Sequence, residues 1–301
     1  MVTNELHLTI HQTAPLLGEV EANEEEVRRR VRESLHRDLL VFPELSLTGY
    51  NLRSNAQRLA RRVSGESPVE LPLGSPPVAL GFPERGEDEL VYNSAVVVHE
   101  HRILAKHRKV YLPTYGLFDE GRYFAAGRDA PPVTTLPSGW RIGILICEDF
   151  WHPSLVYLLA VQGADVVLVL SAAPGRGEPL PDADRKMDTG SAGDGGPLLF
   201  GSTANWSLLA RTAAVQYGLF LVLANRAGVE EGVTFAGESL VVGPDGRVMA
   251  RAPQAEAAVL DISLPRPALT RARNPFAHLR DEDPDYLRRG LRALPGAFWE
   301  I

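Results

Sequence analysis

Short apolar segments alternate with amphipathic ones in the first part of the chain. Residues 6–12 alternate apolar and polar side chains, which predicts a strand, and residues 39–42 form a short apolar strand that ends at Pro43. Between them, Asn23 is followed three residues later by Glu26. This capping-box pattern predicts a helix from Asn23 to about Arg37. A weaker pattern predicts a second helix over residues 54–63.

The same alternation continues through the rest of the chain. A helix is predicted to begin at Pro153, and another over 206–217 to end at Gly218. The turn Pro244-Asp245-Gly246 predicts a hairpin between segments 235–242 and 247–252. A second hairpin is predicted from segments 91–99 and 102–107. Buried strands are predicted over 141–147, 164–171 and 219–224.

Strands that alternate with helices, with hairpins among them, predict a layered α/β fold with a mixed sheet or two packed sheets. We expect one domain over residues 1–264. The Arg- and Pro-rich remainder, 265–301, is expected to pack on that domain or on a neighbouring subunit. Residues 174–201 are rich in Gly, Pro, Asp and Ser and lack periodicity, so they form either a surface insertion or a substrate-gating loop.

Composition narrows the class of protein. With 301 residues, 45% hydrophobic and 23% charged, the chain is not disordered as a whole. Its net charge of −7 argues against a nucleic-acid partner. The longest mainly apolar run, 166–173, is too short to span a membrane. No basic stretch precedes an apolar one at the N-terminus, so we expect no secretory signal. The single cysteine cannot form an internal disulfide, so we expect a cytoplasmic protein.

Cys147 is the first candidate for chemistry. It ends the predicted strand 141–147 and precedes Glu148, Asp149 and the helix that begins at Pro153. A side chain between strand and helix emerges at the carboxyl edge of a sheet, near the positive end of the helix, which favours a thiolate. The alternative is a buried structural cysteine. Because the adjacent carboxylates oppose ionisation, a functional thiol here needs a nearby cation or base.

Three further side chains could complete such a site. Glu44 follows the strand 39–42 and precedes a Gly49-Tyr50 turn, so it could be a partly buried general base. Lys109 follows a hairpin and is one of only three lysines against 28 arginines, so it is a candidate cation for an oxyanion. Glu120 lies among aromatic residues and could orient Lys109. Each signal is weak by itself, because Glu44 could be a turn acid and Lys109 a surface cation.

Together these residues supply a nucleophile, a base and a cation for an oxyanion on loops at one sheet edge. Acyl transfer at an amide requires this set of groups. His152 leaves open a Cys-His dyad, although at a helix start it more often caps or packs.

Three motifs occur in order between residues 5 and 262: Phe-Pro-Glu44-Leu with Thr-Gly-Tyr50, Lys-His-Arg-Lys109-Val-Tyr-Leu-Pro, and Gly-Ile-Leu-Ile-Cys147-Glu-Asp. They resemble the carbon–nitrogen hydrolases of the nitrilase superfamily, whose members share a Glu-Lys-Cys triad. Segments 111–120 and 147–151 are similar to the glutaminase domain of glutamine-dependent NAD synthetases. The sequence has no Ser-Gly-Gly-x-Asp-Ser pyrophosphate loop, so we expect no synthetase domain in it. Glu120 also matches the second glutamate of many members of this family.

The resemblance implies a four-layer αββα sandwich, usually dimerised through one helical layer, with a C-terminal tail that often crosses to a neighbouring subunit. It implies that Glu44 takes the thiol proton, Cys147 attacks the amide carbon, and Lys109 with a backbone N–H holds the oxyanion. Glu120 would keep Lys109 and Glu44 oriented. No metal and no organic cofactor are expected.

The substrate remains open at this point. Glutamine-like and other primary amides are favoured, N-carbamoyl amino acids or amines come next, and nitriles follow. The chain could instead be an ammonia-supplying glutaminase subunit of a separate synthetase, or a binding module without activity, against which the complete triad argues. The predicted substrate-binding residues are Tyr50, Tyr115, Glu148, Phe150 and Trp151, together with the loop 174–201.

Overall fold

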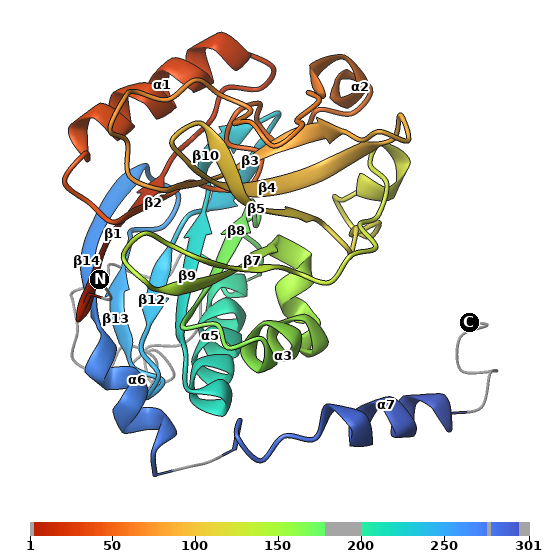
Figure 1. The fold of residues 1–301 in the computed structure, drawn as a ribbon. Helices are drawn as coiled ribbons and strands as arrows, with labels where there is room; N and C mark the ends of the chain where they lie inside the picture. Colours follow the sequence, from red (N-terminus) through yellow and green to blue (C-terminus); the bar gives the residue numbers. More distant parts are fainter. Residues whose placement is uncertain (1–2, 178–199, 276–277, 295–301) are drawn as a thin grey trace.

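Two six-stranded sheets form the centre of the molecule (Figure 1). The computed structural model describes residues 3–177, 200–275 and 278–294. The first sheet has the order β14-β1-β2-β3-β4-β5 and the second the order β13-β12-β9-β8-β7-β6. The strands of the first sheet are β1 (Glu5–Gln12), β2 (Leu39–Val41), β3 (Val78–Arg85), β4 (Val91–His99), β5 (Arg102–Arg108) and β14 (Ala258–Pro265). Those of the second are β6 (Val133–Thr135), β7 (Arg141–Ile146), β8 (Val166–Ser171), β9 (Phe220–Asn225), β12 (Leu240–Val242) and β13 (Val248–Arg251).

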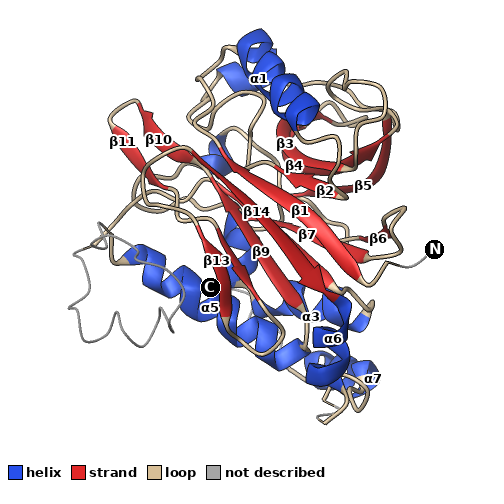
Figure 2. Cartoon of the chain, turned by 90° about the vertical axis from the view of Figure 1, so that its left-hand side faces the viewer, coloured by secondary structure: helices blue, strands red, loops and turns tan. Residues whose placement is uncertain are grey.

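Helices cover the outer faces of both sheets (Figure 2). Helix α1 (Val20–Glu33) lies on the first sheet, where its Val27 and Val31 pack against strand residues such as Phe82. Helices α3 (Pro153–Val161) and α5 (Ser202–Tyr217) lie on the second sheet. The short helix α2 (Asn55–Leu59) lies near the ends of β3 and β4. This helix–sheet–sheet–helix order confirms the predicted four-layer αββα architecture.

The core between the sheets is apolar. Leu8, Val41 and Val97 of the first sheet share one cluster with Ile144 and Leu168 of the second, and all five are inaccessible to solvent. Three parallel strands lie inside each sheet: β1, β2 and β3 in one, and β7, β8 and β9 in the other. Parallel strands covered on both faces require nearly continuous apolar sequence, which is why β2, β7, β8 and β9 were recognisable.

Most predicted elements are confirmed with small changes at their ends. The predicted hairpin is the β4–β5 pair, helix α3 begins at Pro153, and the Pro244-Asp245-Gly246 turn joins β12 to β13. Four strands, β3, β6, β14 and β10 (Ala227–Glu230), were not predicted. The helix predicted over 54–63 is only α2, and the predicted loop 174–201 lies mostly outside the described residues.

The predicted capping box at Asn23 is wrong. Helix α1 begins at Val20 and ends at Glu33, so Asn23 lies inside the helix and is buried. Its side-chain amide accepts a hydrogen bond from Leu16 N and donates one to Leu16 O, both of 2.7 Å. The amide therefore holds the preceding loop, because tertiary burial outweighed the local capping pattern.

The single strand predicted over 235–242 is also wrong. It is divided between β11 (Val233–Ala236) and β12, because the backbone turns at Gly237 and Glu238, where φ is 62° and 54°. Strand β11 pairs instead with β10 (Ala227–Glu230). The resulting hairpin projects from the body of the molecule in Figure 2.

The C-terminal segment contains two helices. Helix α6 (Arg266–Arg273) packs on the domain, with Leu269 buried and Arg273 bonded to Asp165. Helix α7 (Pro284–Arg292) has no buried residue and extends along the lower side of the molecule in Figure 1. No helix in the described part of the chain combines the length and apolar character that a membrane span requires.

Candidate active site

Three of the predicted site residues come directly after strands whose ends meet. Glu44 follows β2 by three residues, Lys109 follows β5, and Cys147 follows β7. Strands β2 and β5 run in the same direction, because β3, β4 and β5 are successively antiparallel and β2 is parallel to β3. Residues from both sheets therefore converge at one end of the sandwich.

Three donors fix the Glu44 carboxylate, which is 1% exposed. Oε1 accepts hydrogen bonds from Asn93 Nδ2 and Lys109 Nζ, each of 2.8 Å. Oε2 accepts one of 2.8 Å from the backbone N–H of Ala172, the residue after β8. Glu44 thus joins the two sheets, and Oε2 keeps acceptor capacity for a proton.

The backbone around Glu44 is tightly packed. A Cβ atom at Gly81 of β3 would lie 2.4 Å from Leu45 N and 3.1 Å from Glu44 Cα, so this position requires glycine. Leu45 itself has φ of 48°, a conformation that residues with a side chain rarely adopt. Backbone strain of this kind is typical of functional sites.

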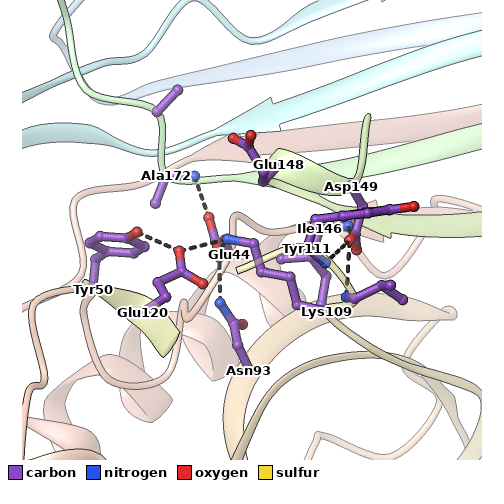
Figure 3. A network of polar contacts seen from close by, with 12 residues as sticks. Glu44, Tyr50, Asn93, Lys109, Tyr111, Glu120, Ile146, Glu148, Asp149 and Ala172 are labelled. Carbon is purple, nitrogen blue, oxygen red and sulfur yellow. Dashed lines mark hydrogen bonds and ion pairs between the residues drawn. The ribbon is translucent and has the colours of Figure 1, made fainter. Parts of the chain in front are cut away.

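Lys109 is fully buried between two carboxylates (Figure 3). Its Nζ lies 2.8 Å from Glu44 Oε1 and 2.7 Å from Glu120 Oε1. Burial alone would lower the pKa of Lys109, but the charges of Glu120 and Glu44 outweigh burial and raise the pKa well above its ordinary value. Lys109 is therefore a permanent cation, and one of its three N–H groups is not used by these two carboxylates.

Glu120 begins the short helix η1 (Glu120–Arg122) and is also buried. Its Oε1 accepts a 2.5 Å hydrogen bond from the Tyr50 hydroxyl in addition to the bond from Lys109. Burial raises the pKa of Glu120 to about 7, against the attraction of Lys109, and the charge of Glu44 adds to the rise. Oε2 is buried and has no hydrogen-bond partner among the described residues, which makes it the oxygen suited to carry a proton.

Cys147 is 5% exposed and begins the short helix η2 (Cys147–Trp151). Its φ of 45° is another left-handed conformation, which turns the chain sharply from strand to helix. Burial raises the pKa of the Cys147 thiol well above its ordinary value, the charge of Glu44 adds to this, and Lys109 opposes it. The resting thiol is therefore neutral, and a base must remove its proton for it to become a nucleophile.

Asp149 connects the Cys147 turn to the Lys109 loop, a role that the sequence analysis missed. Its Oδ1 accepts the backbone N–H groups of Val110 and Tyr111, each at 3.0 Å, as Figure 3 shows. Its Oδ2 lies 2.8 Å from His107 Nε2 and 3.3 Å from Ile146 N. Its place two residues after Cys147 was the available signal, because a fully buried carboxylate needs several donors.

Charged and aromatic side chains surround the site on one side. The Tyr115 hydroxyl lies 2.9 Å from Glu148 Oε2, and its ring packs edge-on against Phe118. The guanidinium of Arg176 lies over the Phe118 ring at 4.7 Å. Burial raises the pKa of Tyr115 to about 12, Glu148 and Cys147 add to this, and Arg176 opposes it. Glu148, Arg176 and Cys147 are therefore all within electrostatic reach of Tyr115.

The other predicted substrate-binding residues lie differently. Phe150 is buried in the core and stacks on Trp206, while Trp151 is 41% exposed and packs edge-on against the same ring. The Tyr50 hydroxyl donates its hydrogen bond to Glu120. His152 stacks flat on Tyr111 with ring centroids 3.3 Å apart, an arrangement typical of packing rather than of a Cys-His dyad.

The arrangement supplies a thiol, a carboxylate that can accept its proton, and a cation for a developing oxyanion. Among residues 3–177, 200–275 and 278–294, no group of three or more His, Cys, Asp and Glu side chains could hold a metal ion.

The fold is that of the nitrilase superfamily. Residues 10–274 match the family profile described as carbon-nitrogen hydrolase, and the chain belongs to this family. Among curated relatives, the glutamine-dependent NAD(+) synthetase of Thermotoga maritima is 31% identical over 81% of this chain and 39% of its own length. That of Acinetobacter baylyi is 27% identical over 82% of this chain and 42% of its own length. The chain thus spans about two fifths of these relatives.

Solved structures share the fold. The glutamine-dependent NAD+ synthetase of Acinetobacter baumannii superposes with a TM-score of 0.71 and 24% identity, covering 88% of this chain and 46% of the synthetase. A carbon-nitrogen hydrolase from Helicobacter pylori G27 gives 0.73 and 20%, covering 96% and 98%. A mutant amidase from Nesterenkonia sp. AN1 gives 0.67 and 24%, covering 94% and 96%; in it the acetamide moiety of fluoroacetamide is covalently added at the active-site cysteine.

Proposed function

We propose that this protein is an amidase that hydrolyses the side-chain amide of a small amino acid, with glutamine as the leading candidate, and releases ammonia. The observation that carries the proposal is the buried Glu44–Lys109–Glu120 cluster within electrostatic reach of the Cys147 thiol. The covalent adduct at the cysteine of the related amidase supports a cysteine nucleophile.

In the first half of the proposed reaction, Glu44 takes the proton of Cys147 as the sulfur bonds to the amide carbon. The carbonyl oxygen becomes an oxyanion, held by the remaining N–H of Lys109 and the backbone N–H of Glu148. The carbon–nitrogen bond then breaks, and Glu44 returns the proton to the leaving nitrogen, so ammonia and a thioester are formed.

In the second half, Glu44 takes a proton from water as the water oxygen bonds to the thioester carbon. The carbon–sulfur bond breaks, Glu44 returns the proton to the Cys147 sulfur, and the acid product leaves. Glu120 keeps Lys109 in place through both halves, because Lys109 retains this partner while Glu44 is protonated.

Two opposite charges near Tyr115 favour an amino acid over a simple amide. The Glu148 carboxylate suits the α-ammonium group, with Tyr115 as its hydrogen-bonding neighbour. The Arg176 guanidinium suits the α-carboxylate, because arginine binds carboxylates through two parallel N–H groups. Ser202 fixes the position of Arg176, since its Oγ accepts Arg176 N at 3.1 Å and its N–H donates to Arg176 O at 2.9 Å.

The test is ammonia release from four amides that differ only in their charged groups: glutamine, glutaramate without the amine, 4-aminobutanamide without the carboxylate, and butanamide without either. We expect kcat/KM to fall in that order from glutamine to butanamide. Glu148→Gln should weaken only amides that carry the amine, and Arg176→Gln only those that carry the carboxylate. Equal rates on all four amides would overturn the amino-acid specificity. If the protein hydrolysed only N-carbamoyl compounds or nitriles, the proposed substrate class of primary amides would be wrong.

A second function is favoured by the synthetases among the relatives. The chain would then be a glutaminase that supplies ammonia to a separate synthetase. If the purified protein by itself released no ammonia from glutamine, and adding a synthetase partner restored turnover, this function would be supported.

We also propose that the protein is cytoplasmic and forms a homodimer or larger homo-oligomer. Helix α7 supports this assembly, because its Leu287 and Leu291 are exposed in the single chain. Sedimentation velocity of the full chain and of Leu287→Ser/Leu291→Ser tests it, and an unchanged monomer in both would overturn it.

A further inference from the structure

The turn that carries Tyr50 is held by a carboxylate far away in the sequence. Glu230, the last residue of β10, accepts the backbone N–H of Tyr50 at 3.1 Å and that of Asn51 at 2.6 Å. A Cβ atom at Gly49, where φ is 78°, would lie 2.7 Å from Glu230 Oε2. Glycine at this position therefore allows the carboxylate to reach the turn.

Arg226 completes a buried ion pair with Glu230. Its Nη1 lies 2.6 Å from Glu230 Oε2, and its Nη2 donates to Pro15 O at 3.3 Å. The guanidinium lies 4.0 Å from the centre of the Phe235 ring on β11. Arg226 is 1% exposed and Glu230 is 6% exposed, so each buried charge needs the other as its counter-charge.

The β10–β11 hairpin also contacts the site by two other routes. The Phe235 ring packs edge-on against the Tyr50 ring at 5.8 Å. Beyond it, Ala236 N donates to Ala173 O, next to the Ala172 N–H that binds Glu44. The hairpin thus contacts the segments that hold both Glu120 and Glu44.

We propose that Glu230 and Arg226 are positioning residues of the reaction, acting through Tyr50 on Glu120 and hence on Lys109. They fix the Gly49–Asn51 turn so that the Tyr50 hydroxyl reaches Glu120 Oε1. This inference rests on the proposed function. The two N–H groups that Glu230 accepts belong to Tyr50 and Asn51, so the ion pair bears directly on the direction of Tyr50 as well as on the fold.

The first experiment compares Glu230→Gln with Tyr50→Phe, which removes only the hydroxyl. We expect each to lower kcat on glutamine about 10- to 100-fold with little change in KM, as for other residues that orient a site from outside. The double variant should lose no more than the more damaged single variant, because both changes act through the same Tyr50–Glu120 contact. Additive losses, or a lower melting temperature with unchanged kcat, would overturn the proposal.

A second readout needs no substrate. The hydrogen bond from Tyr50 lowers the pKa of Glu120, which is about 7. Losing this bond should therefore move the titration of Glu120 to higher pH. We expect this shift in both variants, in the pH dependence of Cys147 alkylation by iodoacetamide, which is specific because the chain has one cysteine. If the wild type hydrolyses no amide, the proposed function fails, yet this profile still decides whether Glu230 acts on the cluster.

The matched control is Glu231→Gln, because Glu231 neighbours Glu230 and pairs with Arg53 at the surface. It should change neither kcat nor the alkylation profile. If Glu230→Gln does not fold, because it leaves Arg226 buried without a counter-charge, Arg226→Gln/Glu230→Gln removes both charges. The double variant should show the same shift, and a wild-type profile in it would overturn the proposal.

Discussion

Replacing Glu44 by glutamine separates two effects of its negative charge. In the proposed reaction the carboxylate is the base, so turnover requires it. The same charge also opposes ionisation of the Cys147 thiol. Glu44→Gln removes both effects at once, and we expect them to act on two measurements in opposite directions.

The structure sets the cost of this change to the fold. Glutamine has one acceptor oxygen, which can keep the bonds from Lys109 and Asn93, so the Ala172 N–H loses its partner. An unpaired buried N–H costs about 1–3 kcal/mol. Lys109 retains Glu120 at 2.7 Å, so the variant leaves no isolated buried charge and should fold.

The cost to catalysis is larger. A positioned general base contributes about 10²- to 10⁴-fold, so kcat for ammonia release should fall by that factor. This corresponds to about 3–5 kcal/mol in the activation free energy. In contrast, the pH at which Cys147 alkylation reaches half its maximum should fall, because the thiol loses a neighbouring negative charge.

The control is Glu84→Gln. Glu84 is equally buried and also pairs with a lysine, Lys106, together with Arg108. We expect it to lower the melting temperature while kcat and the alkylation profile stay within a few-fold of wild type. Unchanged turnover in Glu44→Gln, or an alkylation profile that moves to higher pH, would refute the assignment of Glu44 as the base.

Three further outcomes follow from the same geometry. Cys147→Ala should reduce turnover to background and abolish alkylation, measured by ammonia release and intact mass. The folded protein keeps a proton on Glu120 up to about pH 7, whereas the ordinary pKa of a glutamate is 4.5. The free energy of unfolding should therefore fall by about 3 kcal/mol as pH rises through this range. Glu120→Gln should remove this pH dependence, measured by urea titrations at pH 5 and 8. Asp149→Asn should cost about 2–4 kcal/mol in unfolding experiments and lower kcat, because an amide cannot accept from all four donors around this carboxylate.

Sequence patterns singled out the groups that we propose to react, because each follows a readable strand. The apolar segments before Glu44 and Cys147 are buried parallel strands, and the hairpin before Lys109 has clear turn residues. Their motifs also carried the resemblance to the family. The convergence of Glu44, Lys109 and Glu120 in space is thus the part of the site that the sequence predicted best.

The groups that hold these residues in place could not be predicted from the sequence. Asn93 lies within an unremarkable strand, and Ala172 contributes only its backbone N–H. Glu230 acts on Tyr50 from 180 residues away. Such contacts depend on how the two sheets pack, and no local pattern encodes that. The same cause explains the error at Asn23, where burial against a loop overrode the local capping pattern.

The charges of the site explain why the thiol is neutral at rest. Lys109 is the one cation in contact with Glu44 and Glu120 among the described residues, and an ionised Cys147 would add a further negative charge to a buried site. In the proposed reaction no such charge is created. The proton moves from sulfur to Glu44 while the negative charge of Glu44 passes, through sulfur, to the substrate oxygen beside Lys109. The net charge of the cluster is constant, and only its distribution around one cation changes. In a poorly solvated site this is cheaper than forming a free thiolate, so burial that makes Cys147 a weak acid is compatible with its use as a nucleophile.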